Sequence, residues 1–95
     1  MNLKLTKQAE KKLRKINKSD NKTAKRIKEA IFSIRDGEAS GESLKGYTNF
    51  KKYRVGKYRL IYTVVDDELW ITIIEKRETV YLTFKHLFDN SDFLK

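Results

Sequence analysis

The chain has 95 residues, 39% of them hydrophobic, and no cysteine. A chain this short buries a modest core, so we expect a single domain over residues 1–95. Without cysteine, disulfides and thiolate–metal sites are excluded, and one histidine cannot build a zinc site, so no metal or other cofactor is expected. No apolar run approaches the roughly 20 residues of a membrane span, and residues 1–18 are too charged for a signal peptide. These features predict a soluble, cytoplasmic protein with no membrane partner.

The formal net charge is +9 and the isoelectric point is near 9.8, which favours an anionic partner, either nucleic acid or an acidic protein. The charge is unevenly distributed. Residues 1–36 hold 12 Lys and Arg against 4 Asp and Glu, a net charge of +8, whereas residues 37–95 hold 10 against 9, a net charge of +1. In the second part, the cations cluster between Lys45 and Arg59 and again at Lys76 and Arg77. A cluster in an otherwise balanced region is the sharper indication of a site.

The first half of the chain predicts a strand followed by two helices. Asn2–Leu5 alternates polar and apolar residues as a short strand does, and Thr6 is well placed to cap the following helix. Helical spacing continues on both sides of a break at residues 17–21, where Ser19 or Asp20 can act as the N-cap. The apolar residues at this spacing are Ala9, Leu13 and Ile16 in the first helix and Ala24, Ile27, Ile31 and Ile34 in the second. The pattern indicates a helical hairpin.

The second half predicts a sheet. From Tyr47 onward aromatic and β-branched residues alternate, and Gly56 with Lys57 suits a two-residue hairpin turn because glycine accepts a positive φ. Residues 66–68 make the next turn, before a third strand. The C-terminal segment is either a strand or a helix, and we favour a helix starting near Tyr81. The expected fold is α+β in the order β-α-α-β-β-β. The helical hairpin lies on one face of a mainly antiparallel sheet, which the first strand joins, and a concave basic face is left open.

Cations from separate strands are expected to meet on this sheet. Because side chains on a strand alternate between its faces, Lys52 and Arg54 share one face of their strand. The next two strands can bring Arg59 and Arg77 beside them. Several positive charges would then converge on something anionic.

Three motifs occur between Leu44 and Tyr81. The first is Leu44-Lys45-Gly46, the second is the run from Tyr53 to Tyr62, YRVGKYRLIY, and the third is Lys76-Arg77-Glu78 followed by Tyr81. Together they resemble the toxin family of RelE and ParE, and the order of elements agrees over nearly the whole chain. For the RelE-like branch the resemblance implies the toxin of a type II toxin-antitoxin system. Such a toxin cleaves messenger RNA in the ribosomal A site and is silenced by a cognate antitoxin, here expected to be acidic.

The chemistry implied for this branch is a metal-independent endoribonuclease that uses the RNA 2′-hydroxyl as nucleophile and thereby inhibits translation. The ParE branch shares the Arg-Val-Gly-x-Tyr-Arg sequence and implies instead an inhibitor of DNA gyrase that does not cut RNA. A third interpretation is a basic module that binds RNA without chemistry. Retention of Lys52 together with Arg77 and Tyr81 favours cleavage.

By this resemblance the catalytic residues are Lys52, Arg59, Arg77 and Tyr81. The two arginines can grip phosphate oxygens and hold transition-state charge. Burial among other cations favours the neutral form of Lys52, which makes it a candidate base. Tyr81 can stack on an exposed base or give a proton to the departing 5′-oxygen. Further cations are expected to bind RNA, and these are Lys51, Arg54, Lys57 and Lys76.

Some of these residues also have a purely structural interpretation. Arg59 can form an ion pair with Glu75 or Glu78, and Tyr81 can close the core with its ring. We interpret His86 as a helix-surface residue. The cations of the helical hairpin either follow ribosomal RNA through phosphate contacts or form a solvated face. An apolar edge either docks an antitoxin helix or packs the C-terminus, and its residues are Leu82, Leu87, Phe88, Phe93 and Leu94.

Overall fold

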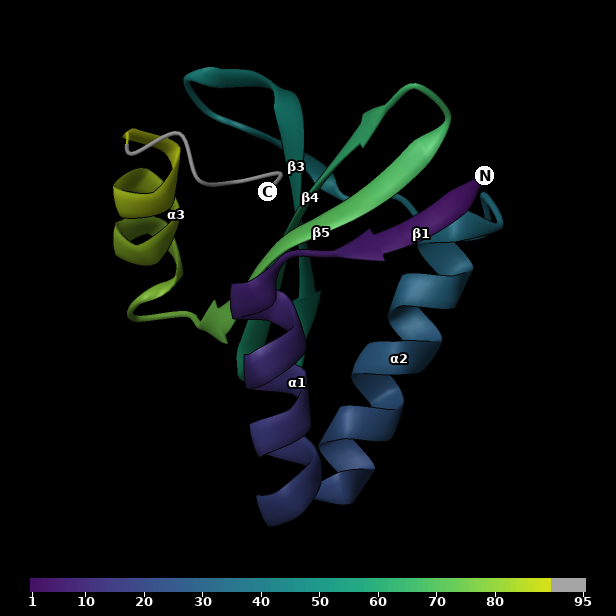
Figure 1. Ribbon diagram of the computed structural model, residues 1–95, viewed down its shortest axis with the longest axis vertical. Coiled ribbons are helices and arrows are strands. Elements are labelled where there is room, and N and C mark those ends of the chain that lie inside the picture. The colour runs from purple at the N-terminus through teal and green to yellow at the C-terminus, as the bar shows by residue number, and fades with distance from the viewer. Residues whose placement is uncertain (90–95) are drawn as a thin grey trace.

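Within residues 1–89, the part of the chain that the computed structural model describes, five strands form one sheet and three helices lie against it (Figure 1). The strand order is β1-β5-β4-β3-β2, with β1 parallel to β5 and the other neighbours antiparallel. The elements are β1 (Asn2–Leu5), α1 (Lys7–Ser19), α2 (Asn21–Arg35), β2 (Glu42–Leu44), β3 (Tyr47–Val55), β4 (Tyr58–Val65), β5 (Glu68–Lys76) and α3 (Val80–Asp89). The expected α+β fold is confirmed, including the first strand in the sheet and the C-terminal helix. Over the same residues, no helix combines the length and the apolar character needed to cross a membrane.

Single polar residues begin the two helices of the hairpin. The Thr6 hydroxyl accepts a hydrogen bond from the first turn of α1 and donates one to the Thr72 carbonyl of β5 at 2.7 Å, which ties the helix start to the sheet. Asp20 alone separates α1 from α2, so the break is shorter than the predicted residues 17–21. Its carboxylate accepts hydrogen bonds from the Thr23 hydroxyl at 2.6 Å and from the Thr23 backbone N–H at 3.2 Å. These bonds favour the charged form and lower the pKa of Asp20.

The hairpin of α1 and α2 covers one face of the sheet and builds the larger core. The helical residues at the predicted spacing meet apolar residues of β4 and β5 such as Leu60, Ile71 and Ile74, which are fully buried. Each such buried side chain stabilises the fold by about 1.5–3 kcal/mol relative to its exposed state. The helical periodicity of residues 7–35 and the alternation of the strands therefore predict the two sides of one buried interface, between the hairpin and the sheet.

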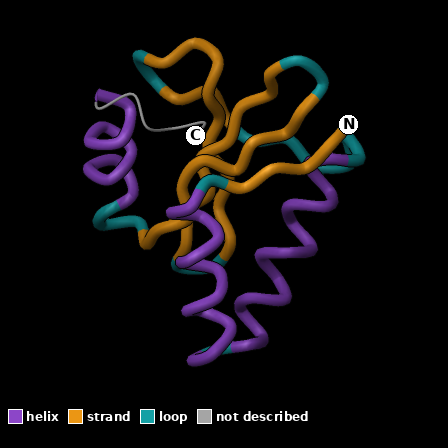
Figure 2. Tube along the Cα trace, viewed as in Figure 1, coloured by secondary structure: helices purple, strands orange, loops and turns teal. Residues whose placement is uncertain are grey.

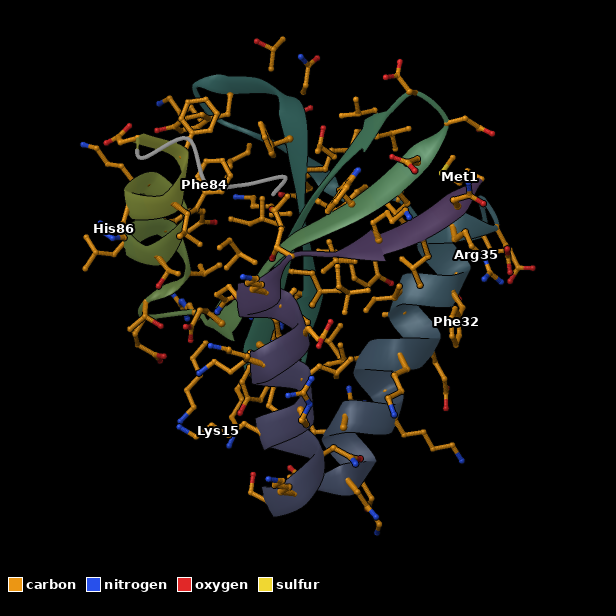
Figure 3. The ribbon with its side chains drawn as sticks, in the orientation of Figure 1. Met1, Lys15, Phe32, Arg35, Phe84 and His86 are labelled. Carbon is orange, nitrogen blue, oxygen red and sulfur yellow. The ribbon has the colours of Figure 1, made fainter. Side chains whose placement is uncertain are left out.

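Helix α3 packs on the other face, so the strands lie between it and the hairpin (Figure 2). In Figure 3, Phe84 lies on the sheet side of α3 and His86 on its outer side. Phe84 is 1% exposed and contacts Ile61 and Ile73 within a second, smaller core, whereas His86 is exposed as expected. Helix α3 is short, so one end of this sheet face is covered and the remainder is available for polar groups.

The short strand β2 was not predicted. It pairs with β3 so that Glu42 lies opposite Lys52, and the register shifts between Ser43 and Leu44. Three residues are too few for alternation to be recognised in a sequence, which explains the omission. Its presence matters because it brings an acidic residue to the edge of the basic strand.

Both hairpin turns agree with the prediction. Gly56 has φ +58° between β3 and β4, and Asp66 and Asp67 have φ 50° and 61° between β4 and β5. Two-residue turns that follow the twist of a sheet require positive φ. The first of these turns determines which residues of β3 and β4 face each other, and hence the geometry of the cationic cluster.

Candidate functional site

An open cleft of ≈ 800 Å³ lies beside the β3–β4 hairpin and collects residues from five separate segments. Among the residues that line it are Glu42 of β2, Lys52 and Arg54 of β3, Arg59 of β4, Arg77 after β5, and Tyr81 of α3. All four predicted catalytic residues therefore line one cleft, together with Arg54. We call this group the cationic cleft.

The register of β3 and β4 places two arginines side by side. Arg54 lies directly opposite Arg59, and the carbonyl of Gly56 accepts hydrogen bonds from Arg54 Nε at 3.3 Å and from Arg59 Nη1 at 3.2 Å. Arg59 Nη1 also donates to the carbonyl of Tyr58 at 3.1 Å. Backbone oxygens of the turn thus hold two like charges together. A guanidinium has five N–H donors, so donors remain available for an anion.

Arg59 is not paired with an acid among the residues that the structure describes. Glu75 lies opposite it in the register, but the Glu75 carboxylate instead accepts a hydrogen bond from Gln8 Nε2 at 3.1 Å and lies 3.1 Å from Lys12 Nζ. The expected alternative, an ion pair of Arg59 with Glu75 or Glu78, is therefore wrong. The reason is that α1 runs alongside the end of β5 that extends beyond its pairing with β1, where Gln8 and Lys12 supply other partners for Glu75.

Arg77 and Tyr81 approach the cleft from the segment that follows β5. The backbone N–H of Arg77 donates to the Lys57 carbonyl at 3.3 Å, which extends the sheet pairing beyond the strand. The side chain of Tyr81 is 46% exposed, so the alternative in which its ring closes the core is wrong; Val80 and Phe84 fill that space. Lys52 Nζ lies 5.8 Å from the centroid of the Tyr81 ring, within the range of a cation–π contact.

Three of the four cations expected to bind RNA lie outside the cationic cleft. Lys51 is adjacent to Lys52 and, by strand alternation, points to the opposite face of β3. Lys57 occupies the turn, with its Nζ 5.8 Å from the centroid of the Tyr58 ring. Lys76 lies opposite Tyr58, whose ring belongs to the core beneath the helical hairpin. Of the expected RNA-binding set, only Arg54 joins the catalytic candidates in the cleft.

Sequence reasoning missed Glu42, which the preceding glycine positions. The Gly41 N–H donates to the Tyr62 hydroxyl at 2.8 Å, and a Cβ on Gly41 would lie 2.3 Å from the Lys52 carbonyl oxygen. Only glycine permits this approach of the loop to β3. The loop therefore enters β2 with Glu42 beside Lys52. Gly41 followed by an acidic residue was the available signal in the sequence, but it identifies a site only once the pairing with β3 is known.

The cationic cleft combines three kinds of chemical group. Guanidinium groups can bind and stabilise phosphate oxygens, the carboxylate of Glu42 or the amine of Lys52 can accept a proton, and the Tyr81 phenol can donate one. Within residues 1–89, no three His, Asp or Glu side chains are grouped so that they could hold a metal ion. The arrangement suits a phosphodiester substrate whose own hydroxyl attacks.

The chain matches a toxin family and is similar to solved structures of YoeB. A family model described as the ParE toxin of the type II toxin-antitoxin system parDE matches residues 3–81, a range that contains every cleft residue named above. Comparison with curated protein sequences gave no match. Among solved structures, the YoeB dimer from Staphylococcus aureus is 27% identical, with a TM-score of 0.71, over 81% of this chain and 97% of that chain.

Two structures of complexes give the same result. The YoeB-YefM complex from Staphylococcus aureus has a TM-score of 0.69 and 27% identity. The heterotetrameric YoeB-YefM toxin-antitoxin complex from that organism has a TM-score of 0.69 and 28% identity. Each again covers 81% of this chain and 97% of the other.

Proposed function

This chain belongs to the family of ParE toxins of type II toxin-antitoxin systems, and from that premise we propose that it is a ribosome-dependent messenger-RNA endonuclease. The observation that carries the proposal is the convergence of Arg54, Arg59, Arg77, Lys52 and Glu42 in one open cleft. A toxin that only blocked another protein would not need a proton acceptor beside a group of unpaired arginines. Cleavage of a phosphodiester needs both.

The arginines supply the electrostatic part of the reaction. Arg59 is held by two carbonyls and forms no ion pair with a described acid, so its remaining donors are oriented before the substrate arrives. Together with Arg77 it would bind the non-bridging oxygens of the scissile phosphate and stabilise the charge that grows on them. Preorganised donors of this kind are usually the largest single contribution to catalysis.

Two proton transfers complete the reaction. The RNA 2′-oxygen attacks phosphorus as its proton passes to Glu42 or Lys52, and the bond from phosphorus to the 5′-oxygen breaks as that oxygen receives a proton from Tyr81. The products are a 2′,3′-cyclic phosphate and a 5′-hydroxyl. Because the attacking group is the 2′-hydroxyl, RNA is cleaved and DNA is not.

The proposed partners are those of a toxin acting in the cytoplasm, where its substrate is translated. The cations of α1 and α2 lie mostly on exposed positions, where they can contact ribosomal phosphates without sequence preference. The YoeB structures with YefM support a cognate antitoxin as the second partner. The positive net charge of this chain favours an acidic antitoxin.

One experiment separates cleavage from gyrase inhibition, the activity that the ParE branch implies. Purified protein is incubated with messenger RNA, with and without ribosomes, and separately with gyrase and relaxed plasmid. The Arg77→Ala variant, prepared in parallel, controls for contaminating nucleases. We expect cuts that require ribosomes, carry a 2′,3′-cyclic phosphate and are lost in the variant. Intact RNA together with blocked supercoiling would overturn the proposal in favour of gyrase inhibition.

A further inference from the structure

A second, smaller pocket of ≈ 290 Å³ adjoins the cationic cleft between the β2–β3 turn and α3. Its walls include Leu44, Tyr47 and Phe84, and it shares Lys52 and Tyr81 with the cleft. We call it the side pocket. Any group bound in it is in direct reach of whatever the cleft holds.

Aromatic packing fixes the walls of the side pocket. The rings of Tyr47 and Phe84 meet edge to face, with centroids 4.8 Å apart and an angle of 86°, and Phe50 contacts Phe84 at 5.1 Å. Phe84 is itself 1% exposed. Phe84 therefore supports the pocket wall from inside the core, and the rings that remain accessible to a planar ligand are those of Tyr47, which is partly buried, and Tyr81, which is 46% exposed.

Two lysines with exposed side chains stand at the rim. Lys45 occupies the turn between β2 and β3, and Lys85 lies on the second turn of α3. Neither forms an ion pair with any residue among 1–89. The ligand that matches this charge and shape has a planar, weakly polar body and carries negative charge at its edge. A nucleotide has this composition.

We propose that the side pocket binds the base of the nucleotide adjoining the scissile phosphate, with its phosphate held by Lys45 and Lys85. The inference rests on the proposed function, because it takes the cleft as the phosphodiester site. Lys52 and Tyr81 line both spaces, so a ligand that spans them must be continuous, as an RNA strand is. Unstacked bases bind to single-stranded RNA sites through such aromatic surfaces beside a cationic track.

A protein helix fits the side pocket less well. An amphipathic helix docks through several apolar anchors spaced along a groove, whereas this is one compact pocket opening into a basic cleft. The pocket also depends on Phe84 and Lys85, which follow the residues 3–81 matched by the family model. The proposed base-binding site therefore includes residues of α3 that lie beyond the region matched by the family model.

Binding to a short RNA that cannot be cut tests the proposal directly. We would measure fluorescence anisotropy with a 2′-O-methyl pentaadenylate and with a pentamer of the same backbone that lacks all bases. The parent should bind the adenylate about tenfold more tightly than the abasic chain, because base stacking on aromatic residues is sequence-tolerant. Lys45→Ala/Lys85→Ala should weaken adenylate binding about tenfold. It should also reduce the slope of log K against log salt by about 1.4, since each lost phosphate contact contributes about 0.7.

Matched controls separate this result from a general loss of charge. Lys4→Ala removes one exposed lysine of β1, outside the helical hairpin and both pockets, and should leave affinity and salt slope unchanged, whereas Lys85→Ala alone should reduce the slope by about 0.7. A 4-thiouridine pentamer irradiated on the parent should crosslink to the segments around Tyr47 and Phe84. Crosslinks confined to other segments, equal effects of Lys4→Ala and Lys85→Ala, or equal binding of adenylate and abasic chains would each overturn the proposal.

The outcomes distinguish this inference from the proposed function. If the parent cuts messenger RNA on ribosomes but the pentamer measurements are negative, the base-binding pocket is rejected and the nuclease remains. If the pentamer results are as expected but messenger RNA stays intact, the pocket stands and the nuclease is rejected.

A synthetic amphipathic helix of glutamate and leucine serves as the protein probe. Loss of its binding, but not of RNA binding, in Lys45→Ala/Lys85→Ala would reassign the pocket to a peptide and overturn the proposal.

Discussion

Two regions of the molecule are rich in cations, and they use them differently. The helical hairpin, within residues 1–36, carries most of the net charge, and its lysines lie mainly on exposed helix positions. The cationic cleft has fewer charges. Its Arg54 and Arg59 side chains come from neighbouring strands and donate to backbone carbonyls, Arg77 follows β5, and none of the three forms an ion pair with an acid among the described residues.

This difference shows that the number of charges is a poor guide to a site. An exposed lysine is hydrated and screened by salt, and it contributes mainly long-range attraction. An arginine oriented beforehand, in contrast, can stabilise charge that appears only in a transition state. We therefore expect substitutions in the cleft to change the chemical step and substitutions in the hairpin to change association or stability.

The largest effect is expected from Arg59→Ala. Loss of one preorganised donor to a developing oxyanion lowers rates by about 100- to 1,000-fold, and single-turnover cleavage on ribosomes would measure it. Lys15→Ala, an exposed position of α1, is the matched control and should leave the rate of the bound complex unchanged. Equal losses in the two variants would break the distinction between the regions. Arg59→Lys should recover little, because an ammonium lacks the forked geometry.

Glu42→Gln decides which group accepts the proton. The amide has nearly the same shape as the carboxylate but cannot act as a base, so the rate should fall by about 100-fold if Glu42 has this role. Glu38→Gln, in the exposed loop before β2, should have no effect. Full activity of Glu42→Gln, together with loss of activity in Lys52→Met, would assign the base to Lys52 instead.

Gly41→Ala tests positioning in the cleft without removing a functional group. The new methyl group would lie 2.3 Å from the Lys52 carbonyl oxygen, so the loop and Glu42 must shift. We expect the cleavage rate to fall on the order of tenfold, since small misplacements of reacting groups are costly. Ser43→Ala, two residues later in β2, provides the control. Unchanged cleavage by a folded Gly41→Ala protein would show that the close approach of the loop does not position the site.

The smallest expected effect is on stability and comes from Asp20, in the hairpin. Hydrogen bonds from Thr23 lower the pKa of this carboxyl in the folded protein. The stabilisation is therefore complete above the ordinary value of 3.8 and is lost as the pH falls through the lower, folded-state pKa. Asp20→Asn should keep the cap at neutral pH but remove this acid-dependent part, as thermal unfolding at several pH values would measure. A change in cleavage rate at neutral pH would contradict the separation of the two regions.

Local patterns in the sequence were sufficient for the elements of the fold other than β2. Thr6 and Gly56 were identified as a cap and a turn residue, and each has that role in the structure; of the two candidates for the second cap, Ser19 and Asp20, the structure selects Asp20. Helical spacing located the hairpin and its buried face. These features depend on neighbours within a few residues, so their physical causes are contained in short stretches of sequence.

The candidate site was predicted only in part, because its remaining features depend on distant contacts. The family resemblance named the residues Lys52, Arg59, Arg77 and Tyr81, and the fold brings them together in the cleft. It did not show that Glu42 joins them, because strand β2 exists only through its pairing with β3. Of the apolar edge proposed at the C-terminus, Leu82 is 76% exposed, Phe88 packs against Tyr47, and two residues lie outside the described part of the chain, namely Phe93 and Leu94.

The sequence by itself therefore determined the order of elements apart from β2, their caps and turns, and the family to which the cationic residues point. Only the tertiary structure decided which cations have no acidic partner. Glu75 faces Arg59 in the register, but it is bound by Gln8 and Lys12 of α1, more than sixty positions away in the chain. Whether an arginine is free to bind phosphate depends on every acid within reach in space. The number of residues between an arginine and an acid in the sequence does not give their distance in space when their segments meet only after folding.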